Sequence, residues 1–140
     1  GVGGDHGGVD VAAGPALADL RATLVDAHAQ AFGGTDDLLV GLQLTHSGRW
    51  SRPTGTPAPR TAAAHPVLDG RVGATDTALL SDDELDHLAR RYVDAAVIAA
   101  DAGFAFVDVK HCHGYLLPTG PPPPRPRPTA PTSPTVNRSR

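Results

Sequence analysis

The stretch "LSDDELDHLARRYVDAAVIAADAGFAFVDV", residues 80–109, decides the fold class because it holds a complete helix followed directly by a strand. Ser81 and Glu84 have capping-box spacing, which predicts that the helix begins there. Gly103 predicts where it ends. Between them an apolar stripe recurs at helical spacing, formed by Leu85, Leu88, Tyr92, Ala96 and Ala99. The run "FAFVDV", residues 104–109, is then predicted to be a strand.

The sequence before this stretch repeats the same order of elements. A helix is predicted from Pro15, and Gly33 and Gly34 supply its stop. Its expected buried face consists of Leu17, Leu20, Leu24, Ala27 and Ala31. The run "DDLLVGLQL", residues 36–44, is continuously apolar after its two acids, which favours a strand covered on both faces. Helix, strand, helix, strand predicts an α/β fold with a right-handed parallel crossover, as in an α/β barrel or a doubly wound sheet.

The two ends and the central connection lack such patterns. Residues 1–14 are glycine-rich and are predicted to be a loop, and residues 118–140 contain nine prolines and are predicted to be a disordered tail. Residues 45–80 form a long connection, which is typical either of a functional cover or of disorder. The abrupt change at Pro118 and the absence of an initial Met suggest a truncated or frameshifted gene product.

Composition excludes several classes of protein. The formal net charge is −3 although the tail carries four arginines and no acid, so residues 1–117 are more acidic still, and nucleic-acid binding is not expected. A single cysteine excludes an internal disulfide and an iron–sulfur ligand set within the chain. No apolar run reaches the ~18 residues that span a membrane, and no secretory signal is visible. A soluble, cytoplasmic protein is predicted.

Two polar segments follow the two predicted strands. They are "QLTHSGRW", residues 43–50, and "KHCHGY", residues 110–115, and the second holds the chain's one lysine and one cysteine. The carboxyl ends of parallel strands meet at one edge of a sheet, where ligands bind in α/β folds. The sequence therefore predicts a functional site at this edge.

Residue types alone leave two other functions open. His111 and His113 lie two apart, so on a strand they would face the same side, as in a metal-dependent hydrolase. Asp108, His46 and His65 could add ligands, but no second ligand pair is recognisable, and no metal is predicted. The other alternative is a non-catalytic interaction protein that presents residues 118–140 to an aromatic groove.

Three segments together resemble the Old Yellow Enzyme family of FMN-dependent ene-reductases, also called NADH:flavin oxidoreductases. They are "GLQLTHSGRWSRP" (41–53), "LSDDELDHLARRYVDAAVIAADAGF" (80–104) and "FVDVKHCHGYLL" (106–117). The resemblance implies that residues 15–117 are a fragment of an eight-stranded (β/α)8 TIM barrel. The fragment would run from about the family's second helix to its fourth strand.

The resemblance also implies roles for individual residues. Gln43 matches the glutamine that bonds the pyrimidine edge of the flavin. Lys110 and His113 match the pair that grips the carbonyl oxygen of the substrate, although the family usually has histidine where Lys110 stands. Tyr115 matches the tyrosine that donates a proton. His46, Gly48 and Arg49 belong to the resembling segments, and only loop shaping is expected of them.

Cofactors and substrate follow from the same resemblance. FMN is the implied cofactor, NADH or NADPH the implied reductant, and an enone or related activated alkene the implied small-molecule substrate. A complete barrel takes about 250 residues. We therefore expect the isolated chain to bind FMN weakly or not at all and to be inactive by itself.

Overall fold

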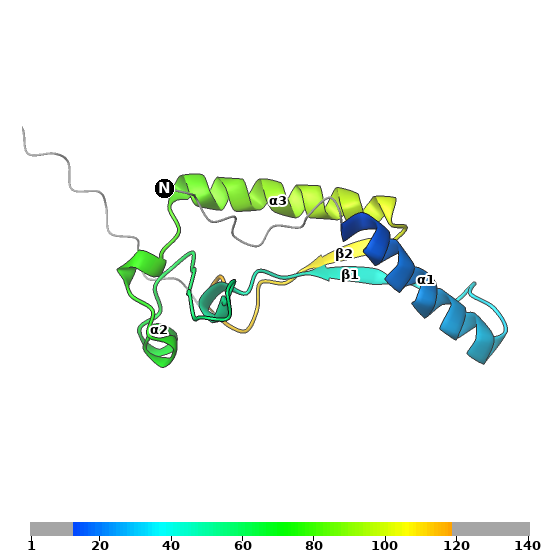
Figure 1. The fold of residues 1–140 in the computed structure, drawn as a ribbon, viewed down its shortest axis with the longest axis horizontal. Helices are drawn as coiled ribbons and strands as arrows, with labels where there is room; N and C mark the ends of the chain where they lie inside the picture. The colour runs from blue at the N-terminus through cyan, green and yellow to red at the C-terminus, as the bar shows by residue number, and fades with distance from the viewer. Residues whose placement is uncertain (1–12, 119–140) are drawn as a thin grey trace, which may run out of the picture.

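A computed structural model describes residues 13–118 of the chain (Figure 1). In order, the elements are α1 (Ala13–Phe32), β1 (Gly41–Leu44), the short 3₁₀ helix η1 (Gly48–Trp50), α2 (Pro66–Val72), the 3₁₀ helix η2 (Asp76–Ala78), α3 (Asp82–Asp101) and β2 (Phe106–Val109). The predicted α/β class is confirmed. The predicted tail lies outside the described residues except for Pro118, and so does the predicted N-terminal loop except for Ala13 and Gly14, which are helical.

Helix α3 begins and ends where the sequence predicts. The Ser81 hydroxyl accepts from the Glu84 N–H at 3.3 Å, and a Glu84 carboxylate oxygen accepts from the Ser81 N–H at 2.8 Å. These bonds, with the Arg60 guanidinium nearby, hold the pKa of Glu84 below its usual value. Gly103, at φ +87°, ends the helix in a left-handed conformation that glycine adopts without strain.

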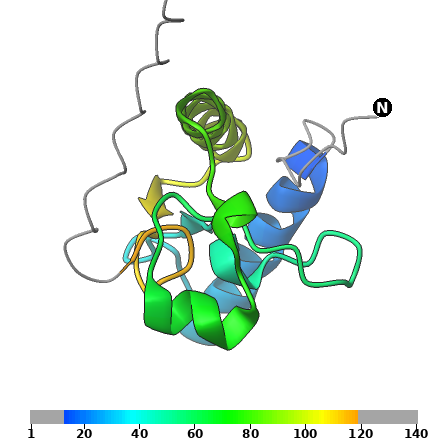
Figure 2. The ribbon, with the colours of Figure 1, turned by 90° about the vertical axis from the view of Figure 1, so that its left-hand side faces the viewer.

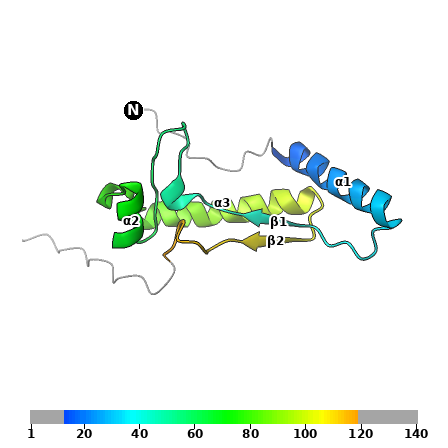
Figure 3. The same ribbon diagram turned by 90° about the horizontal axis from the view of Figure 1, so that it is seen from below.

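The two strands form the parallel pair that the crossover predicts. Leu42 is opposite Val107 and Gln43 is opposite Asp108 in the register. Each strand is shorter than its apolar run, because only four residues of each run pair with the other strand. Helix α3 runs antiparallel to both strands and covers one face of the sheet (Figures 1 and 3). The alternation of side chains along a strand places Gln43 and Asp108 together on one face.

Helix α1 is present, but its predicted buried face is wrong. Leu20 and Leu24 remain 52% and 49% exposed, and Ala27 and Ala31 are exposed as well. Of the predicted face only Leu17 is partly covered, and Arg21 and Val25, which were not predicted, are partly covered with it. Figure 3 shows the reason: α1 leans away from the sheet and meets only the end of α3.

The connection between β1 and α3 is ordered and contains a helix that was not predicted from the sequence. Pro66 occupies the first turn of α2, the His65 ring accepts from the Leu68 N–H at 3.3 Å, and Gly73 ends the helix at φ +65°. Thr61 pairs with Leu79 in a parallel bridge, which draws the two ends of the connection together. The connection lies at the carboxyl ends of the strands (Figure 2).

Buried apolar side chains come from the sheet, from α3 and from this connection. They are Leu44, Ala62, Ala78, Ala95, Ala99, Phe104 and Leu116. No helix within residues 13–118 combines the length and the apolar character needed to cross a membrane.

Candidate functional site

The two polar segments meet at one edge of the sheet, as the sequence predicts. The Lys110 N–H donates to the Leu44 carbonyl oxygen at 3.0 Å, which extends the pairing of the strands one step beyond their ends. From this point the chain continues into residues 45–50 on one side and 111–117 on the other (Figure 1). The edge is therefore the carboxyl end of both strands, where α/β folds place their ligands.

Three of the four predicted site residues lie together there. The Lys110 Nζ sits 4.2 Å from the centroid of the Tyr115 ring, within the range of a cation–π contact. The His113 and Tyr115 rings are 6.3 Å apart between centroids. An ammonium, an imidazole and a phenol thus share one short segment. Their catalytic roles stay predictions.

The backbone of this segment is unusual. His113 has φ +62° and Gly114 has φ +65°, so two consecutive residues are left-handed. His113 is the one non-glycine residue with positive φ within residues 13–118. Histidine, asparagine and aspartate adopt this conformation more readily than other non-glycine residues, but at a cost in energy. A Cβ on Gly114 would lie 2.5 Å from Leu68 Cδ1, so α2 packs directly on the turn.

Gln43, the predicted flavin contact, lies on the sheet beside this segment. Its amide nitrogen donates to Asp108 at 2.7 Å, and its amide oxygen accepts from the Thr45 hydroxyl at 3.4 Å. The side chain is exposed and its partners are surface groups, so the amide can exchange them for a ligand at small cost. Sequence reasoning did not foresee the bond to Asp108, because the pairing depends on the strand register.

The geometry gives no support to the metal-site alternative. His111 stacks on Tyr92 at 6.3 Å between ring centroids, whereas His113 lies beside Tyr115. The two imidazoles therefore have different neighbours. Among residues 13–118 no three His, Cys, Asp or Glu side chains are placed to hold a metal ion. Cys112 is exposed and has a free thiol.

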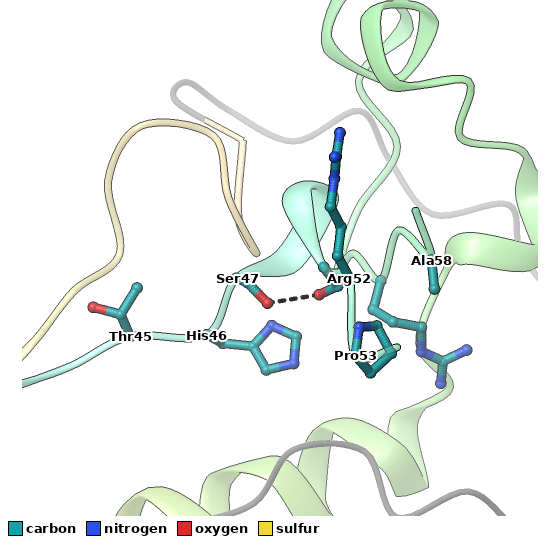
Figure 4. Close-up of a pocket in the computed structure, with 8 residues that line it drawn as sticks. Thr45, His46, Ser47, Arg52, Pro53 and Ala58 are labelled. Carbon is teal, nitrogen blue, oxygen red and sulfur yellow. Dashed lines mark hydrogen bonds between the residues drawn. The ribbon is translucent and has the colours of Figure 1, made fainter. Parts of the chain in front are cut away.

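A cavity of about 400 Å³ opens next to the site, after β1 (Figure 4). Its lining residues are Thr45, His46, Ser47, Ser51, Arg52, Pro53, Ala58 and Arg60. The His46 Nδ1 accepts from the Gly48 N–H at 2.9 Å, which leaves Nε2 to carry the proton of the neutral ring. Burial, and then the nearby charge of Arg60, lower the pKa of His46. None of the four predicted site residues lines this cavity.

The burial and the hydrogen bonds of Arg49 are the main structural feature of the site that was not predicted from the sequence. It is 2% exposed, and its guanidinium donates to Asp69 and to the Ala63 carbonyl, each at 2.5 Å. The same guanidinium donates to the Gly114 carbonyl at 3.0 Å, and the Arg49 backbone N–H donates to the Tyr115 carbonyl at 2.9 Å. The loop shaping expected of Arg49 thus consists of four hydrogen-bond partners, two in the connection and two in the site segment. We call this set of contacts the Arg49 junction.

Gly48 makes this junction possible. It adopts φ +56°, and a Cβ there would stand 2.1 Å from the Tyr115 carbonyl carbon and oxygen. Any side chain would therefore push the Tyr115 backbone away. The glycine and arginine of "SGRW" are used together, the first for close approach and the second for its donors.

Comparison with known proteins identifies the family of the chain. Residues 34–119 match the model of the NADH:flavin oxidoreductase / NADH oxidase family. The chain belongs to this family. The match includes β1, the whole connection, α3, β2 and the site segment, so all four predicted site residues fall within the family region.

One curated protein matches the chain over a shorter range. It is an NADH oxidase from Thermoanaerobacter brockii, 33% identical over 76 residues, which is 54% of this chain. The chain spans only 12% of the length of that relative. No solved structure matches the chain significantly. Family membership therefore gives flavin and NADH use as the family chemistry, and the activity of the whole protein is a matter for proposal.

Proposed function

We propose that the chain carries the third and fourth strands of an FMN-dependent (β/α)8 barrel, and that the barrel reduces activated alkenes such as enones with NADH or NADPH. The observation that supports this most is the grouping of Lys110, His113 and Tyr115 at the carboxyl end of a parallel strand, in a family that uses flavin. Parallel strands of a barrel deliver catalytic residues at this end.

Gln43 is the proposed contact with one edge of the flavin. The exposed Gln43 amide both donates and accepts, as the pyrimidine edge of an isoalloxazine requires. When bound, FMN would supply the hydride that it has received from the nicotinamide. Gln43 would exchange its bond to Asp108 for one to the ring and so orient it.

The polar side chains would then act on the substrate. Adding hydride to the β-carbon of an enone moves negative charge onto the carbonyl oxygen. The Lys110 ammonium and an imidazole N–H of His113 both donate hydrogen bonds and would stabilise that charge. The Tyr115 phenol would give its proton to the α-carbon, so that one hydride and one proton together saturate the double bond.

The 140-residue chain by itself is expected to bind FMN weakly. The sheet described here has two strands, whereas a barrel that encloses the flavin has eight. Titrating the chain into FMN and following the quenching of flavin fluorescence measures the affinity. Gln43→Ala is the matched variant, since it removes the one proposed ring contact. Stoichiometric, tight binding of FMN would contradict the expectation of weak binding without affecting the family assignment.

A chimera tests the activity. Residues 34–119 would replace the matching segment of the Thermoanaerobacter brockii NADH oxidase, which supplies the rest of a family protein. We expect the chimera to retain flavin and to oxidise NADH with an enone as electron acceptor. The absorbance of NADH and the saturated ketone product are the two readouts, and the unaltered host is the control. A flavin-loaded chimera that leaves the enone unreduced would overturn the proposal.

A further inference from the structure

Two segments distant in sequence from Arg49 converge on its guanidinium. Its side chain is 1% exposed, and Asp69, at 2.5 Å, supplies the opposite charge from α2. The carbonyl oxygens of Gly114 and Tyr115 lie 3.0 and 3.4 Å from its Nη1. The chain is left-handed at His113 and Gly114, directly before the second of these carbonyls. The left-handed turn and the two bonds to Arg49 therefore fall on the same three residues.

The place of the Tyr115 ring depends on the backbone of this turn. A left-handed turn without partners for its carbonyls would relax toward ordinary backbone angles. Arg49 supplies those partners, and the packing of Leu68 on Gly114 closes the other side. With the backbone fixed in this way, the Tyr115 ring faces Lys110 Nζ at 4.2 Å.

We propose that Arg49, held in place by Asp69, is the positioning residue of the site: it fixes the Gly114 and Tyr115 carbonyls and thereby holds the Tyr115 ring against Lys110. Neither Arg49 nor Asp69 touches the substrate in this scheme. Helix α2 becomes a support for the substrate-binding segment. The relevance to catalysis rests on the proposed function, whereas the positioning itself is a property of the chain alone.

The chain offers a direct spectroscopic readout, because Lys110 is its one lysine. In the full 140-residue chain labelled with ¹³C-lysine, the side-chain ε-methylene gives one signal. The Tyr115 ring current shifts that signal upfield, and Tyr115→Leu defines its unshifted position. We expect Arg49→Gln to move the signal to the Tyr115→Leu position while the far-UV circular dichroism of the helices is retained. A solely structural Arg49 would change stability but leave this shift in the folded protein.

Two further variants make the test specific. Asp69→Asn keeps the guanidinium and removes only its counter-charge, so it serves as the readout if Arg49→Gln loses its helical signal, and we expect it to reduce the shift. Arg60→Gln breaks another arginine–carboxylate pair of the same connection, with Glu84, and should leave the shift intact. A full shift in a folded Arg49→Gln or Asp69→Asn chain would overturn the proposal, and so would an equal loss in Arg60→Gln. Failure of FMN binding or of enone reduction would leave this result standing.

Discussion

Replacing Asp69 with alanine is expected to lower the free energy of unfolding by about 3–5 kcal/mol. The substitution removes the carboxylate that pairs with Arg49 and leaves the guanidinium buried, with a side chain that is 1% exposed. The positive charge of the buried guanidinium is then uncompensated, because water cannot replace the missing carboxylate. The free-energy cost of this unpaired charge exceeds the net stabilisation that the ion pair itself provides. Urea denaturation followed by far-UV circular dichroism measures the difference.

A matched control separates burial from charge pairing. Arg60 and Glu84 also form an ion pair, but their side chains are 24% and 45% exposed. Arg60→Ala should therefore cost no more than about 1 kcal/mol. Asp69 also accepts from the His65 N–H at the start of α2, so Asp69→Ala removes this bond together with the ion pair. Asp69→Asn keeps a side-chain oxygen for the bond and removes only the negative charge. Equal losses of unfolding free energy in Asp69→Ala and Arg60→Ala would show that the Arg49–Asp69 pair stabilises the fold no more than an exposed ion pair does.

Local signals were sufficient for α3 and for the topology. The Ser81–Glu84 capping box, the apolar stripe and Gly103 act within a few residues of one another, so the sequence contains the whole cause of the helix. A strand–helix–strand order then leaves one hand for the crossover. The length of each strand depended on pairing between strands instead. Leu38 and Leu39 therefore lie outside β1 although they belong to the same apolar run.

Burial of α1 could not be read from its own pattern. A periodic stripe shows which face of a helix is suited to packing, but the neighbour that covers it is set by the rest of the structure. Here α1 contacts α3 near one end, and Leu20 and Leu24 stay half exposed. Helix α2 is the opposite case: Pro66 and Gly73 were readable signals for its ends, and the proline-rich surroundings obscured them.

The proximity of Lys110, His113 and Tyr115 was predicted from the sequence, but the contacts that support their segment were not. Placing Lys110, His113 and Tyr115 at one strand end needed only the parallel topology and the resemblance. The pairing of Arg49 with Asp69 joins residues twenty positions apart across an irregular connection, and no periodicity encodes it. The left-handed φ of His113 is likewise not encoded by a local pattern, and the next carbonyl in the chain, that of Gly114, accepts from Arg49.

Replacing Tyr115 with phenylalanine in the chimera is expected to lower the rate of enone reduction by about 10²–10⁴-fold. The substitution keeps the ring that Lys110 contacts and removes only the phenolic proton. Reduction of the flavin by NADH needs no proton from this residue, so that half-reaction should keep its rate. Stopped-flow absorbance of the flavin separates the two steps: reduction under anaerobic conditions with NADH, and reoxidation on mixing with the enone.

The second tyrosine provides the control. Tyr92 lies on α3 beside His111, and burial raises the pKa of its hydroxyl, which makes it a poor proton donor near neutral pH. Tyr92→Phe should therefore leave both half-reactions within a few-fold of the parent chimera. If Tyr115→Phe reoxidises at the parent rate, the proton comes from another donor or from water, and the role assigned to Tyr115 is wrong. If it slows flavin reduction and reoxidation equally, the hydroxyl supports the fold of the site and does not serve as the proton donor.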